Sequence, residues 1–164
     1  MSTQMADPYQ AMVSFQQGLQ AGILELVQVP SRPNLYAHFD MPAPNTPRLT
    51  YVQLASDRTV RAFIACIRNG QIDGSPCMAV GYAVPENLRN QGLAKQILSD
   101  VMQEQVALAK QGGHSVLYLE AVIDEENLPS QKVAEAVFRV ERESITDSES
   151  GRPAYRYTKR LATA

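Results

Sequence analysis

The sequence predicts an α/β fold with a mixed sheet, in which antiparallel strands come first and a parallel pair lies in the middle. Strand-like runs separated by turn residues fill residues 49–84. A nearly continuous apolar run at 77–84 is followed by an amphipathic helix and a second apolar run at 116–122. Strand, helix and strand in this order form a right-handed parallel crossover. The 164 residues suit one domain with a full hydrophobic core.

The N-terminal part predicts one helix and then irregular chain. Asp7 is suited to cap a helix over 8–24, with Pro8 in its first position. Apolar residues repeat there at helical spacing: Met12, Phe15, Leu19 and Ile23. Five prolines lie between Pro30 and Pro47, so we expect a loop-rich passage with one short strand at 35–39.

The middle of the chain predicts three strands, at 49–55, 60–67 and 77–84. The dipeptides Asn69-Gly70 and Asp73-Gly74 are typical of the turn between the last two.

After Pro85, a helix is predicted over 92–110, ended by Gly112-Gly113. The apolar strand at 116–122 and a short helix at 127–137 follow. Segments 138–145 and 154–161 are expected to pair as a closing hairpin.

Composition argues against several classes of function. The net charge is −2 and no run of lysine or arginine is present, so we expect no nucleic-acid partner. Cys66 and Cys77 lie in apolar runs, which predicts buried free thiols, and no Cys/His spacing predicts a metal site. No apolar stretch reaches the roughly 18 residues of a membrane span, and no signal peptide is evident. A cytoplasmic protein without a membrane partner is therefore expected.

The hexapeptide from Arg89 to Ala94 connects the 77–84 strand to the following helix. The first amides of a helix lack intrahelical partners and lie at the positive end of its dipole, where a pyrophosphate can bind. Gly92 lets an anion approach the backbone closely, and Arg89 can add a charged contact. Taken alone, the hexapeptide is equally consistent with an ordinary connection that contains a glycine.

The segment from Ala79 to Ala94 resembles the acetyl-CoA-binding motif of the GNAT superfamily of N-acyltransferases. The resemblance covers roughly residues 49–161 and implies a single domain over 1–164 with a divergent part at 1–48. It also implies that the central parallel strands splay apart around the pantetheine of coenzyme A. The candidate cofactor-binding residues on the strand and turn are Tyr82, Ala83, Val84, Arg89, Asn90, Gln91, Gly92, Leu93 and Ala94.

The next segment is similar to the family's second block, a strand over 117–122 and a helix start over 127–130. By that likeness Asn127 bonds the pantetheine and Ser130 lies near the cofactor; simple helix capping by Asn127 is the alternative. Glu120 lies within the apolar strand, where desolvation suits a general base, and related enzymes use such a glutamate. A structural glutamate is the other interpretation.

The family's usual proton-donating tyrosine corresponds to Ala134 here. Tyr155 is therefore carried as a candidate catalytic residue, with Ser130, Tyr157 and water as alternatives.

The resemblance implies direct transfer of an acetyl group from acetyl-CoA to a primary amine. A backbone amide around Tyr82 or Val84 would stabilise the oxyanion, and no metal is required. A GNAT-like module that binds acyl-CoA without turnover is the main rival, and an α/β interaction protein without a coenzyme A site is a third hypothesis. A small-molecule amine and a peptide amine are both consistent with the sequence as acceptor. Many members of the family form homodimers, so a homodimer is also consistent with the resemblance.

Overall fold

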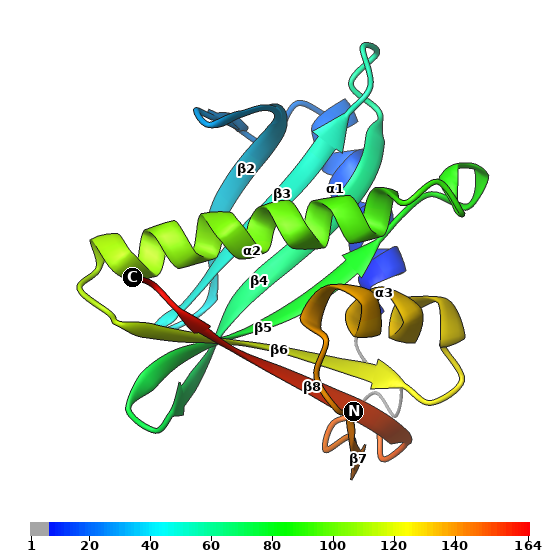
Figure 1. The fold of residues 1–164 in the computed structure, drawn as a ribbon. Coiled ribbons are helices and arrows are strands. Elements are labelled where there is room, and N and C mark those ends of the chain that lie inside the picture. Colours follow the sequence, from blue (N-terminus) through cyan, green and yellow to red (C-terminus); the bar gives the residue numbers. More distant parts are fainter. Residues whose placement is uncertain (1–6) are drawn as a thin grey trace.

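The computed structural model describes residues 7–164. These residues form an eight-stranded sheet in the order β1-β2-β3-β4-β5-β6-β8-β7 (Figure 1). The strands are β1 (Val27–Val29), β2 (Arg32–Ala43), β3 (Thr46–Leu54), β4 (Val60–Ile72), β5 (Ser75–Ala83), β6 (Val116–Asp124), β7 (Glu143–Thr146) and β8 (Pro153–Ala162). The helices are α1 (Pro8–Gln20), α2 (Leu93–Gln111) and α3 (Leu128–Phe138), with a 3₁₀ turn η1 (Glu86–Leu88).

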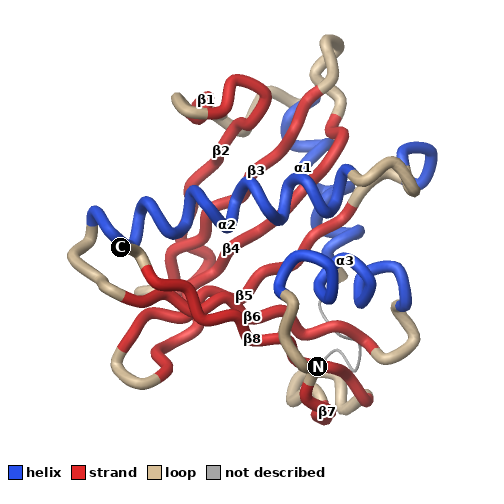
Figure 2. The backbone as a smooth tube through the Cα atoms, viewed as in Figure 1, coloured by secondary structure: helices blue, strands red, loops and turns tan. Residues whose placement is uncertain are grey.

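The helices cover the two faces of the sheet unequally (Figures 1 and 2). Helices α2 and α3 lie on one face, where Ile97 and Phe138 are fully buried in the larger core cluster. Helix α1 lies on the opposite face, where Met12 packs with Val52 and Phe63 in a smaller cluster. The sequence patterns therefore predicted the fold class correctly: a mostly antiparallel sheet with a parallel β5–β6 pair, flanked by helices.

The prediction of a loop-rich passage at 30–47 is wrong. Strand β2 runs through most of it and pairs antiparallel with β3. Pro42 fits because it lies where the pairing register shifts between Asp40 and Ala43, and because β1 pairs with β2 only as far as Ala37. A proline at an irregular, open strand edge removes no ladder hydrogen bond.

Two further boundaries differ from expectation for backbone reasons. Strand β4 continues through Asn69-Gly70 as a bulge, with a register shift between Arg68 and Gln71. The hairpin turn is Asp73-Gly74, with φ of 49° and 78°, as a tight two-residue turn requires. Helix α1 ends at Gln20, short of 24, because Gly22 takes a φ of 72°.

The C-terminal part confirms the closing hairpin, in which β7 and β8 pair antiparallel. Its first strand is shorter than expected because α3 continues to Phe138 and Arg139 then takes a left-handed conformation. Strand β8 also pairs with β6 along the whole of β6, so it lies between β6 and β7. Among residues 7–164, no helix is both long and apolar enough to cross a membrane.

Candidate functional site

Strands β5 and β6 separate in the middle of the sheet. They pair in parallel only between Cys77–Ala79 and Tyr118–Glu120. Beyond that point β5 continues to Ala83 and β6 to Asp124, and β6 stays paired with β8 on its other side. The edge of β5 that faces β6 after Ala79 thus has backbone groups open to a ligand, at the splayed parallel pair that the sequence resemblance implied.

Two cavities meet at this gap. The first has a volume of about 580 Å³ and lies between the start of α1, the end of β5, the turn before α2 and the start of α3. The second, of about 320 Å³, lies between the diverging strands and is lined by Val80 and Gly81 of β5 and Val122 and Asp124 of β6. Five residues line both cavities: Asp7, Pro8, Tyr82, Asn127 and Ser130.

The turn that opens α2 has the geometry of an anion site. Gly92 is the N-cap, with φ 75° and ψ 9°. Among the described residues no side chain caps this helix end, and its first turn carries no acidic residue. A Cβ on Gly92 would meet no atom within 4 Å. The first amides of α2 therefore remain free to donate to a ligand in the first cavity. The residues present fit a phosphate group of coenzyme A.

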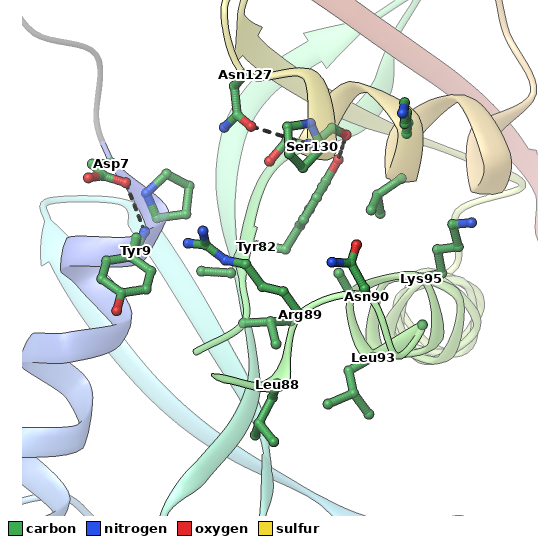
Figure 3. Close-up of a pocket in the computed structure, with 18 residues that line it drawn as sticks. Asp7, Tyr9, Tyr82, Leu88, Arg89, Asn90, Leu93, Lys95, Asn127 and Ser130 are labelled. Atoms are coloured by element: carbon green, nitrogen blue, oxygen red, sulfur yellow. Dashed lines mark hydrogen bonds between the residues drawn. The ribbon is translucent and has the colours of Figure 1, made fainter. Parts of the chain in front are cut away.

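Three cationic side chains line the first cavity. They are Arg89 from the turn, Lys95 from the first turn of α2 and Lys132 from α3. The Arg89 guanidinium lies over the ring of Tyr9 from α1, with its carbon 5.5 Å from the ring centroid (Figure 3). A lysine near a helix N-terminus opposes the helix dipole, and a bound anion would relieve that repulsion. Sequence reasoning found Arg89 but missed the other cations, because lysines on helix surfaces carry no distinctive spacing.

The start of α3 supplies the opposite wall. Asn127 caps the helix, its Oδ1 accepting from the backbone N–H of Ser130 at 3.2 Å, so the capping interpretation is confirmed. Both residues also line the two cavities. Tyr82 reaches from β5 across to this helix, and its hydroxyl donates to the Ser130 carbonyl at 2.6 Å (Figure 3). Burial raises the pKa of the Tyr82 hydroxyl above its usual value.

The cofactor candidates gather at this site with one exception. Tyr82, Ala83, Val84, Arg89, Asn90, Gly92, Leu93, Ala94, Asn127 and Ser130 all line the first cavity. Gln91 is exposed and is not among the lining residues of either cavity.

The two catalytic candidates lie outside both cavities. Glu120 is half-buried, and Asn69 Nδ2 donates to its Oε1 at 3.4 Å. It is the last β6 residue paired with β5, and Val122, two residues along on the same face, lines the second cavity. The guanidinium of Arg142 lies over the ring of Tyr155, with its central carbon 3.7 Å from the ring centroid. The alternative Tyr157 is buried, with its hydroxyl donating to Glu135 at 3.3 Å.

The second cavity contains a carboxylate that the sequence did not single out. Asp124 Oδ1 accepts from the N–H of Glu126, and Oδ2 pairs with Arg152 Nη2, both at 2.9 Å. Asp7, which caps α1 through the N–H of Tyr9, brings a second carboxylate to the same cavity. The strand predicted at 116–122 ended before Asp124, so the sequence did not indicate that this carboxylate lies at the end of β6.

The cysteines are free and buried, as predicted. Burial raises the pKa of Cys66 to about 12 and that of Cys77 to about 11. Both thiols are therefore poor nucleophiles near neutral pH. Among the described residues, no group of three or more His, Cys, Asp or Glu side chains is placed to hold a metal ion.

Solved structures share this arrangement of elements. RimJ from Mycobacterium smegmatis, in complex with CoA-disulfide, superposes with a TM-score of 0.55 and 13% identity over 94% of this chain and 64% of its own. RimL, a ribosomal L7/L12 α-N-protein acetyltransferase in complex with coenzyme A, superposes with a TM-score of 0.54 and 15% identity, over 71% of this chain and 64% of its own. The NatC complex bound to Gag peptide and CoA superposes with a TM-score of 0.52 and 14% identity, over 98% of this chain and 86% of its own. This chain thus spans about two thirds of the length of RimJ and RimL. At these identities the likeness shows the fold.

The comparison of sequences is more specific. No curated protein matches this chain. The family model described as "Acetyltransferase (GNAT) family" matches residues 22–138, which run from before β1 to the end of α3 and include the whole turn from Arg89 to Ala94. The matched range is more than half of the chain, and the splayed strands and the uncapped turn at Gly92 fit it. The chain belongs to the GNAT acetyltransferase family.

Proposed function

We propose that this protein is an N-acetyltransferase that uses acetyl-CoA and transfers its acetyl group directly to a primary amine. The junction of the two cavities at the β5–β6 gap carries the proposal. The first cavity offers free helix amides and cations for phosphates. The second offers carboxylates for an ammonium group. A thioester held across the junction would meet an amine there.

The donor side is supported by the turn and by the strand before it. The amides of Leu93 and Ala94 at the start of α2 would receive the pyrophosphate, with Asn90 and Gln91 shaping the turn. Arg89 adds a charged contact. The free edge of β5 at Tyr82, Ala83 and Val84 would bond the pantetheine, and one amide there would polarise the thioester carbonyl. Asn127 and Ser130 complete the wall from α3.

The acceptor side is supported by charge. Asp7 and Asp124 line the second cavity, and only Arg152 offsets them among its lining residues. Carboxylates attract an ammonium ion, which must lose a proton before it attacks. Glu120 lies on the same face of β6 as Val122, which lines the second cavity, and we propose that a water molecule relays that proton from the second cavity to Glu120. Glu120 is therefore our proposed general base.

The leaving thiolate also needs a proton donor, for which Tyr155 is the sequence-based candidate. Tyr155 is stacked on Arg142 and lines neither cavity, so the proposal assigns it no contact with the acetyl donor.

Two proteins of similar structure are named as acetyltransferases of amines. RimL is described as a ribosomal-protein α-N-acetyltransferase, and a chimera of SpeG from Vibrio cholerae and hSSAT as a spermidine N-acetyltransferase. By analogy we propose a peptide or small-molecule amine as acceptor. We further propose a single catalytic domain, a cytoplasmic location and, as in many relatives, assembly as a homodimer.

The competing proposal is a module that holds acyl-CoA without turnover, favoured by Ala134 standing where the family usually has a tyrosine. An acetyl-transfer screen separates the two. Purified protein is incubated with acetyl-CoA and a panel of primary amines that includes spermidine and peptides with free N-termini. Coenzyme A release and acetylated product are measured together. Binding of acetyl-CoA by calorimetry without any product supports the module, and absence of binding rejects both proposals.

A further inference from the structure

The side chain of Tyr82 holds a special position between the two cavities. It extends from β5, lines both cavities, and is only 6% exposed. Its hydroxyl bridges the gap to α3 through the 2.6 Å hydrogen bond to the Ser130 carbonyl (Figure 3). Tyr82 is thus part of the wall that the two cavities share, at the junction where a thioester and an amine would meet.

We propose that the Tyr82 hydroxyl donates the proton that the sulfur of coenzyme A takes up when the acyl group leaves. This inference rests on the proposed function and adds to it the missing proton donor. Of the five residues at the junction, only Tyr82 and Ser130 carry a hydroxyl. A phenol releases a proton far more readily than an aliphatic alcohol does, so Tyr82 is the better donor of the two.

The position of Ala134 fits this assignment. Ala134 is fully buried on α3, one helical turn after Ser130, so no side chain beyond Cβ extends from this position toward the sheet. The Tyr82 hydroxyl lies against this turn through its hydrogen bond to the Ser130 carbonyl. Strand β5 thus delivers a phenolic hydroxyl to the inner surface of α3, although α3 itself carries no tyrosine.

The chemistry balances without another reactant. The amine nitrogen forms a bond to the carbonyl carbon, the carbon–sulfur bond breaks, and sulfur leaves with the electron pair. Tyr82 gives its proton to that sulfur and exchanges its hydrogen bond to Ser130 for one to sulfur. The ammonium nitrogen gives its first proton to Glu120 before it attacks, and the phenolate recovers, through water, the second proton, which that nitrogen loses after the attack. Because burial raises the pKa of Tyr82, the phenol is protonated near neutral pH and its phenolate is a strong base for that second proton.

The first test needs no acceptor. Coenzyme A is bound to the wild type, to Tyr82→Phe and to Tyr51→Phe, and the bound thiol is titrated by the ultraviolet absorbance of its thiolate, with the desulfo-CoA complex as reference. Tyr51→Phe is the matched control because it also removes a buried strand hydroxyl that hydrogen-bonds to a helix, here to Gln105 of α2, at a residue outside both cavities. The chain's own thiols interfere little, since the pKa of Cys66 is about 12 and that of Cys77 about 11.

A hydroxyl that donates to sulfur stabilises the thiolate. Tyr82→Phe is therefore expected to raise the pKa of the bound thiol by about one or more, while Tyr51→Phe leaves it unchanged. An equal thiol pKa in the wild type and in Tyr82→Phe overturns the inference while the proposed function stands. Failure of coenzyme A to bind the wild type overturns both.

The second test uses the amine that gives most product in the acetyl-transfer screen. Tyr82→Phe is expected to lower kcat by about 10²-fold or more, with little change in KM for acetyl-CoA, because a proton donor acts in the transition state. Thermal unfolding of both variants shows whether the fold is kept. Equal kcat for the wild type and Tyr82→Phe would overturn the inference, whatever the control shows.

Discussion

Replacing Gly92 by alanine tests the phosphate turn most directly. Gly92 has a φ of 75°, and the new methyl group would meet no atom within 4 Å. The fold therefore loses only the cost of a left-handed alanine, about 1–2 kcal/mol. Gly92 lines the first cavity and is the N-cap of α2, so the methyl group is added next to the first amides of that helix. If it removes one hydrogen bond to a charged phosphate, about 1.5 kcal/mol or more, the affinity for acetyl-CoA falls roughly tenfold or further.

Gly113→Ala is the matched control. Gly113 follows the other end of α2, has a φ of +84°, and likewise has no atom within 4 Å of a Cβ. It lines neither cavity. Both variants are expected to lose about the same stability in urea unfolding, whereas only Gly92→Ala loses acetyl-CoA affinity in calorimetry. Equal affinity in the two variants would refute the assignment of this turn to phosphate binding.

Three further outcomes are expected. Glu120→Gln should lower turnover by about 10²-fold or more without weakening acetyl-CoA binding, and unchanged turnover at saturating substrates would remove Glu120 as the base. Cys66 and Cys77 should not react with a thiol reagent near pH 8 until the protein unfolds, because burial raises the pKa of Cys66 to about 12 and that of Cys77 to about 11; rapid labelling of the native protein would contradict this. The hydrogen bond from Arg48 lowers the pKa of Asp40 below its ordinary 3.8. The pair therefore stabilises the fold above that pH and loses its effect as pH falls through the lowered pKa. Asp40→Asn should cost up to about 1 kcal/mol in urea unfolding near neutral pH and progressively less as the pH falls below 3.8, and a pH-independent cost would contradict the ion pair.

Local chain chemistry explains why parts of the site could be predicted from the sequence. The turn at Gly92 depends on neighbours in the chain: a strand ended by Pro85, a glycine and an amphipathic helix. The same is true of Asn127, whose side chain caps a helix that starts at the next residue. These features are read correctly because every interacting group lies within a few residues. The resemblance to the family then connected the two segments.

Other parts depend on contacts between distant segments. Asp7, Pro8 and Tyr9 line the first cavity although they precede the matched range, because α1 crosses to β5: a Cβ on Gly81 would lie 3.1 Å from the Pro8 ring. The prolines at 30–47 suggested loops because a proline lacks a donor, yet an open strand edge does not need that donor.

Local residue patterns were enough to predict the α/β class, the central strand–helix–strand unit and the glycine turn at the start of α2, since hydrophobic period and turn residues act locally. Which of the candidate residues lie together depends on contacts between distant segments. Pairing between β5 and β6 stops after three residue pairs, and this opens the gap in which Tyr82 reaches α3. The same packing leaves Glu120 and Tyr155 outside both cavities. Where two strands part is set by the packing of whole elements, and no local pattern of residues encodes it.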